Sequence, residues 1–98
     1  MNKNEVISRI KSHEPALRQA GLGSLYLFGS VASDRAHDGS DVDLFFDLDR
    51  AQGFTLFDLV DLQEKLEEIV GTKVDLMSRN GIHPRKKDRI IQSAYQIF

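Results

Sequence analysis

An alternation of polar and apolar residues between Asp41 and Leu48, strict for several residues, constrains the fold more than any other part of the sequence. Because successive side chains of a strand point to opposite faces, this pattern predicts an amphipathic β-strand. Its apolar face consists of Val42, Leu44, Phe46 and Leu48. Its other face consists of Asp41, Asp43, Phe45 and Asp47. The chain must therefore pack a core against one side of this strand.

Apolar spacing predicts the elements before this strand. The first segment has a helical pattern of apolar residues, an Asn2-to-Glu5 capping pair and a stop at Gly21, and Pro15 is expected to kink or split it. The continuous apolar run from Leu25 to Phe28, closed by Gly29, predicts a buried strand.

A helix, a strand and a helix are expected after it. The helix opens at Thr55 and ends at Gly71, and the strand covers 73–77. The last helix is expected to turn the following side chains inward: Ile90, Ile91, Ala94, Ile97 and Phe98. This order predicts an α/β (α+β) fold, with a small mixed sheet of about three to four strands and helices packed mainly on one face. The carboxylate face is expected to stay open.

Length and composition limit the classes of function. The 98 residues, with no internal linker or repeat, are expected to form one domain, 1–98. The absence of cysteine excludes disulfides, Cys-ligated zinc and a thiol nucleophile. No apolar run approaches the roughly 20 residues of a membrane span, so we expect a cytoplasmic protein that does not bind membranes. The net charge of −2 argues against a general nucleic-acid binder.

The residues that indicate chemistry lie between Phe28 and Asp47. Gly29 lets a ligand approach the backbone closely, and Ser30 offers a hydroxyl and backbone N–H groups to phosphate oxygens. Ten residues later, Asp41 and Asp43 project from one strand face, where two like charges share a proton or recruit cations. An oxygen-only ligand set favours Mg²⁺ or Mn²⁺.

Asp75 is the third carboxylate, on the later strand and turned away from the core. It joins the other two if the two strands are neighbours, and three carboxylates suffice for a two-metal site. Each feature alone has a simpler explanation: Gly-Ser is usually a turn, and Asp-x-Asp is often a solvated strand face. Together they favour a site, because aspartate is disfavoured in strands.

The arrangement of Gly29-Ser30, a ten-residue connection, Asp41-Val42-Asp43 and a later Asp75 resembles the signature of nucleotidyltransferases of the DNA polymerase β superfamily. The length is most similar to that of the minimal (MNT) members, the antitoxins of HEPN/MNT toxin–antitoxin pairs. The resemblance implies a polymerase-β-like fold, a Ser30 contact to nucleotide phosphate, and two Mg²⁺ ions on Asp41 and Asp43. It also implies that Asp75 lies beside the incoming hydroxyl.

One position departs from that signature. Many minimal members carry Arg-Gly directly after the Ala of the motif, whereas this chain has Ser33 and Asp34, with Arg35 further on. Two roles are open for Arg35, a replacement phosphate ligand or an ordinary surface residue. Two roles are also open for a basic cluster near the start of the last helix. It is either a solvated face or a binding patch, and it consists of Arg85, Lys86, Lys87 and Arg89.

The resemblance implies transfer of AMP from ATP to a hydroxyl, expected on a Tyr, of a HEPN ribonuclease toxin in a hetero-oligomer. A chain with a metal site and no acceptor-binding domain needs a partner to present the acceptor. Two alternatives stay open. The chain is a non-catalytic antitoxin that neutralises its partner by binding and occlusion, or it modifies a small molecule such as an aminoglycoside.

Overall fold

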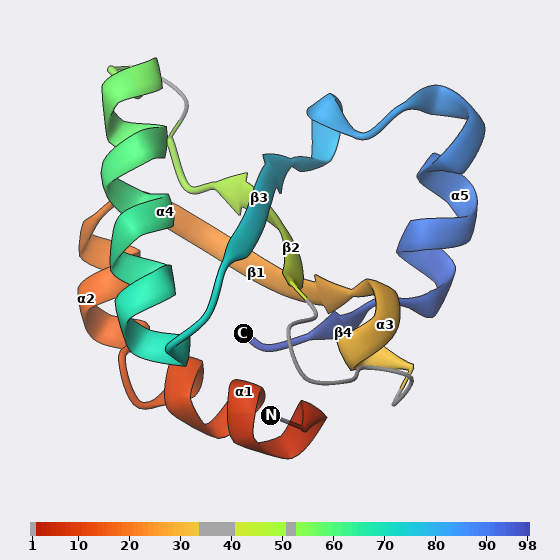
Figure 1. Ribbon diagram of the computed structural model, residues 1–98. Coiled ribbons are helices and arrows are strands. Elements are labelled where there is room, and N and C mark those ends of the chain that lie inside the picture. Colours follow the sequence, from red (N-terminus) through yellow and green to blue (C-terminus); the bar gives the residue numbers. More distant parts are fainter. Residues whose placement is uncertain (1, 34–40, 51–52) are drawn as a thin grey trace.

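The computed structural model describes residues 2–33, 41–50 and 53–98, and shows a small twisted sheet between two unequal groups of helices (Figure 1). The strands lie in the order β3-β2-β1-β4; β1 is antiparallel to β2 and β4, and β2 is parallel to β3. The helices are α1 (Lys3–Lys11), α2 (Glu14–Gln19), α3 (Gly29–Ala32), α4 (Leu56–Val70) and α5 (Pro84–Ser93). The strands are β1 (Leu22–Phe28), β2 (Val42–Leu48), β3 (Val74–Ser78) and β4 (Tyr95–Gln96), and a 3₁₀ turn covers Arg79–Gly81. The mixed sheet of about three to four strands is confirmed.

Local capping chemistry fixes the start of α1 and both ends of α4 as the sequence predicts. The Asn2 side chain accepts a hydrogen bond from the Glu5 backbone at 2.9 Å and starts α1. Thr55 and Asp58 form a reciprocal capping box at the start of α4. Gly71 ends that helix in the left-handed conformation, with φ 78°. The expected split of the first segment is also confirmed, since α1 and α2 are separate helices.

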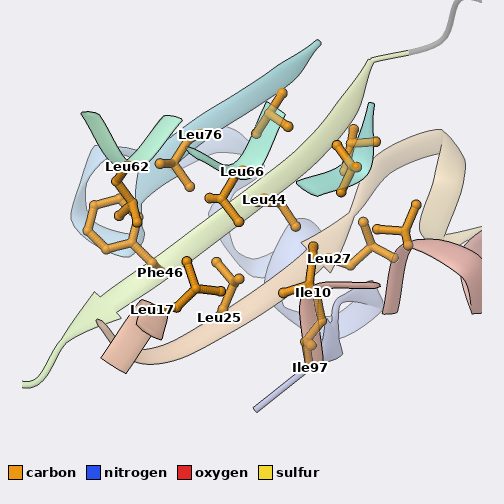
Figure 2. Packing of buried hydrophobic residues seen from close by; sticks show 14 of the residues in the cluster. Ile10, Leu17, Leu25, Leu27, Leu44, Phe46, Leu62, Leu66, Leu76 and Ile97 are labelled. Carbon is orange, nitrogen blue, oxygen red and sulfur yellow. The ribbon is translucent and has the colours of Figure 1, made fainter. Parts of the chain in front are cut away.

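The main core lies between one face of the sheet and the helices α1, α2 and α4 (Figures 1 and 2). The alternation in β2 decides which face this is, because Val42, Leu44 and Phe46 are all buried in that core. From α4, Leu62 and Leu66 pack against the sheet, as Figure 2 shows. The strand that displays the carboxylates is therefore held from behind by the largest part of the core.

The opposite face is partly covered, which corrects the expectation that it stays open. Phe45 points to the carboxylate side and is fully buried with Phe28 and Ile82. Side chains of α5 pack on this second, smaller cluster. The aromatic residue amid the carboxylates of β2 explains the covering, because a large apolar side chain there needs to be shielded from water. The carboxylate end of the face remains accessible.

The end of the chain corrects a second expectation. Helix α5 stops at Ser93, and Ala94 adopts an extended conformation instead of continuing the helix. The next two residues pair as β4 with Tyr26 and Leu27 of β1. Ile97 is buried, as expected, but from an extended segment whose N–H donates to the Leu25 carbonyl at 2.8 Å. Pairing satisfies the exposed backbone groups of the β1 edge, which outweighs the helical spacing.

Within the described ranges, no helix combines the length and the apolar character that crossing a membrane requires.

Candidate active site

Three strand ends meet at one end of the sheet and bring the predicted acidic residues together. Asp43 lies opposite Phe28 of β1 in the antiparallel pair and beside Asp75 of β3 in the parallel pair. Gly29 and Ser30 follow Phe28 directly, so they emerge next to Asp43. The adjacency of β2 and β3, on which the inclusion of Asp75 depended, is present.

The carboxylates differ in their exposure to water. Asp41 and Asp75 are exposed and Asp43 is half-buried. Burial raises the pKa of the Asp43 carboxyl above its ordinary value, and the negative charges of Asp75 and Asp41 raise it further. Among the described residues, neither of the ion pairs involves any of these three aspartates. Within the described residues, these carboxylates therefore have no cation in ion-pair contact.

The donor set suits a hard divalent cation, since it consists of carboxylate oxygens that repel one another. The side chains are not yet gathered for that purpose: within the described residues, no group of three or more His, Cys, Asp or Glu is arranged to hold a metal ion. Binding would therefore have to draw the carboxylates together.

Gly29 is required by its surroundings as well as by its backbone conformation. Its φ is 76°, which side chains of L-residues rarely allow, and a Cβ added to it would overlap the Asp43 carboxylate. The glycine therefore lets the turn after β1 pass directly over Asp43. Half-buried Ser30 is placed immediately beyond this contact.

Asp47 shares the strand face with Asp43 but lies outside the site. Arg79 donates two hydrogen bonds to its carboxylate, Nε to Oδ1 and Nη2 to Oδ2, each at 2.9 Å. The guanidinium also lies over the rings of Tyr26 and Phe45, at 4.9 and 5.1 Å. Sequence reasoning missed Arg79. Only the pairing of the strands indicates it. Phe46 pairs with Ser78 in the parallel ladder, so the residues that follow them, Asp47 and Arg79, are neighbours.

A cleft of about 420 Å³ lies between α3 and α5, and its lining includes Gly29, which contacts Asp43. Gly29 and Ser30 line one side, while Lys86 and Arg89 of the basic cluster line the other. Arg85 and Lys87 do not line it. The structure thus places two of the four clustered cations near the Gly-Ser motif, a proximity that the sequence alone could not show. Arg35, the candidate replacement ligand, lies outside the described residues.

The sequence matches the model of the nucleotidyltransferase domain over residues 5–96. A Methanocaldococcus jannaschii protein described as a candidate protein adenylyltransferase, MJ0435, is 37% identical over 98 residues, which is 100% of each chain. The protein adenylyltransferase MntA of Thermococcus cleftensis is 30% identical over 79 residues, covering 80% of this chain and 78% of that protein.

Solved structures share the fold. A structure described as a candidate minimal nucleotidyltransferase superposes with a TM-score of 0.81 at 29% identity, covering 97% of this chain and 95% of that one. A complex of the tri-AMPylated Shewanella oneidensis HEPN toxin with its MNT antitoxin matches with a TM-score of 0.62 at 21% identity, covering 99% of this chain and 69% of that one. The domain match over nearly the whole sequence, together with these relatives, shows that the chain belongs to the nucleotidyltransferase domain family, among its minimal members.

Proposed function

We propose that the chain is an antitoxin that transfers AMP from ATP to a hydroxyl group, on a Tyr, of a partner HEPN ribonuclease. The observation that carries this proposal is the meeting of Gly29 and Ser30 with Asp43 and Asp75 at one end of the sheet. The names of the relatives support protein as the acceptor, and the complex of an AMPylated HEPN toxin with an MNT antitoxin supports the partner. The cysteine-free composition is consistent with a cytoplasmic site of action.

The proposed reaction exchanges one phosphorus–oxygen bond for another. The acceptor oxygen forms a bond to the α-phosphorus, the bond from that phosphorus to the bridging oxygen of the β-phosphate breaks, and pyrophosphate leaves. The hydroxyl proton passes to Asp75, whose carboxylate is exposed at the site. Asp41 and Asp43, together with Asp75, would hold the metal, and Ser30, which follows Gly29 directly, would contact the phosphates.

Mg²⁺, or Mn²⁺ in its place, would supply charge neutralisation for the phosphates and activation of the attacking oxygen. Asp41, Asp43 and Asp75 are the residues that would hold two such ions. Binding can be measured without turnover: Mg²⁺ should raise the thermal midpoint of the natural chain, because the ion relieves the repulsion among the carboxylates. The Asp43→Asn variant should respond less to the same Mg²⁺ titration.

The proposal includes a partner protein because this small chain has no separate domain to bind the acceptor. Another molecule must therefore present the hydroxyl group. Added phosphate next to an RNA-cleaving centre would repel RNA and obstruct access, so one modification could silence the toxin. The assay incubates the chain with a HEPN protein of the same organism, ATP labelled at the α-phosphate, and Mg²⁺. We expect label on the HEPN protein and a matching increase in its intact mass.

Two variants of β2 make this assay specific. Asp43→Asn should abolish labelling, whereas Asp47→Asn should retain it, because Asp47 is engaged by Arg79 and lies outside the site. Both replacements remove one negative charge from the same strand face. The proposal fails if the natural chain transfers no label, or if Asp43→Asn labels the partner as well as the natural chain does.

One observation favours a second candidate, neutralisation by binding alone. The chain has Ser33 and Asp34 where many minimal members carry Arg-Gly, so the arginine that those members offer to phosphate is absent from this position. In that case the Asp43→Asn chain would bind the HEPN protein and inhibit its RNA cleavage as strongly as the natural chain, with no label transferred. Loss of inhibition in a variant that still binds would instead support catalysis.

A further inference from the structure

The cleft between α3 and α5 contains features that the carboxylate site does not explain. Its volume of about 420 Å³ lies within the range of ~300–1,000 Å³ usual for small-molecule sites. Its polar lining comes from two distant parts of the chain: Gly29, Ser30, Ser33, Lys86, Arg89 and Ser93. One wall is thus the Gly-Ser motif itself, and the other belongs to the last helix.

The wall formed by α5 is positively charged. Lys86 and Arg89 are three residues apart, so they share one side of the helix, and both are exposed. In the part of the chain that the structure describes, neither forms an ion pair. No described carboxylate lines the cleft. Lys86 and Arg89 thus line the cleft together with Gly29 and Ser30 and have no described counter-ion. Such a pair of cations suits an anionic ligand.

Gly29 connects this charge to the reaction centre. The space that its missing side chain would occupy holds the Asp43 carboxylate, and the same residue lines the cleft. The wall of the cleft therefore adjoins Asp43 at Gly29, and a polyphosphate in the cleft would have one end near this aspartate and the other near Lys86 and Arg89. Ser33 supports this wall, since its hydroxyl donates to the Gly29 carbonyl at 3.0 Å.

From this arrangement we infer that Lys86 and Arg89 bind the β- and γ-phosphates of the nucleoside triphosphate. The inference rests on the proposed function and adds to it the residues that hold the leaving pyrophosphate. In the sequence, Arg35 is the candidate to replace the missing phosphate-binding arginine of the motif. The inference assigns these phosphate contacts to Lys86 and Arg89 instead. The guanidinium of Arg89 can bind phosphate oxygens in pairs, and Lys86 adds a point charge.

Nucleotide binding to the chain without its partner tests this assignment. The Kd of an ATP analogue that cannot be cleaved between its α- and β-phosphates is compared with that of AMP, in the presence of Mg²⁺. In the double variant Lys86→Ala/Arg89→Ala, we expect the Kd of the analogue to rise roughly tenfold or more, as loss of charge-assisted hydrogen bonds would produce. The Kd of AMP, which lacks the β- and γ-phosphates, should change less than about twofold.

The same helix offers a matched control. Arg85→Ala/Lys87→Ala removes the same charge from α5 at positions that do not line the cleft, and should leave the Kd of the analogue unchanged. Arg89→Lys in place of Arg89→Ala should recover part of the lost affinity. Each variant is expected to fold, because the replaced side chains are not in the core. Urea unfolding of each variant checks this.

The outcomes separate this inference from the proposed function. If the natural chain binds the analogue and labels its partner, while the two double variants bind as tightly as it does, the assignment of Lys86 and Arg89 is wrong and the proposed function stands. Equal losses for the analogue and for AMP also overturn the assignment. A natural chain that binds no nucleotide overturns both.

Discussion

Gly29 lies so close to Asp43 that a methyl group on its α-carbon would overlap the Asp43 carboxylate. The two residues come from different parts of the motif, one after β1 and the other within β2, and the antiparallel pairing of Phe28 with Asp43 brings them together. The glycine therefore sets how near the turn after β1 can come to the acidic residues of β2.

Replacement of Gly29 by alanine should cost more stability than the backbone conformation alone explains. Gly53 is the matched control, because it also has a positive φ, 85°, but no atom of the described residues, its chain neighbours aside, lies within 4 Å of a Cβ placed there. Gly53→Ala should lower the free energy of unfolding by about 1 kcal/mol. Gly29→Ala should lower it further, as Asp43 must move. Equal losses in urea unfolding would mean that Asp43 shifts without cost.

Much of the fold could be predicted because local chemistry and tertiary packing agree in β2 and α4. The alternation from Val42 to Leu48 assigns each side chain to the face that it occupies, and Thr55 and Gly71 bound their helix as expected. The end of the chain could not be predicted in this way. Strand β4 has two residues, too few to show a period, and it forms because the edge of β1 is available.

The site was predictable to the extent that it lies on one strand. The spacing of Asp41 and Asp43 puts both on one face, whereas the position of Asp75 beside Asp43 depends on the parallel pairing of β2 and β3. The contact of Arg79 with Asp47 was not predictable, and neither was which members of the basic cluster line the cleft, since tertiary packing alone decides both. The assignment of catalytic and metal-binding roles to the aspartates remains a prediction that the Asp43→Asn assays test.

Two leucines of α4 should differ sharply in their contribution to stability. Leu66 is fully buried against the sheet, whereas Leu56 in the first turn is 73% exposed. Leu66→Ala removes packed methyl groups and leaves a cavity, so the free energy of unfolding should fall by about 2–5 kcal/mol. Leu56→Ala should change it by less than about 0.5 kcal/mol. Comparable losses in urea unfolding would contradict the packing of α4 on the sheet.

The ion pair between Asp47 and Arg79 should give a measurable coupling. Its two hydrogen bonds of 2.9 Å have good geometry, but both side chains are partly exposed, so a coupling of about 0.5–1 kcal/mol is expected. A double-mutant cycle with Asp47→Ala and Arg79→Ala separates this coupling from the contacts of Arg79 with Tyr26 and Phe45. The coupling should weaken in high salt. A coupling near zero at low salt would show that the pair contributes nothing.

Without a bound metal, the charge on Asp43 should destabilise the folded chain. Burial and the charges of Asp75 and Asp41 raise the Asp43 pKa in the folded state, so between the ordinary value of 3.8 and the raised value the folded chain binds more protons than the unfolded chain. Stability from this group is therefore greatest below the ordinary pKa and is lost as the pH rises through the raised one. Asp43→Asn removes the charge, so in a metal-free buffer at pH 7 the variant should be more stable than the natural chain.

Urea unfolding in EDTA at a series of pH values measures this difference. The advantage of Asp43→Asn should grow as the pH rises from below 3.8 through the raised pKa, and then level off. Asp47→Asn should show no such gain, because it removes the charge and one of the two acceptor oxygens to which Arg79 donates. The opposite result, an Asp43→Asn chain less stable than the natural chain at pH 7, would contradict this. It would mean that a favourable contact of the charged Asp43 carboxylate outweighs the cost of its burial and its repulsion by Asp75 and Asp41. In that case the site would be stable when charged, and a metal ion would not be needed to relieve it.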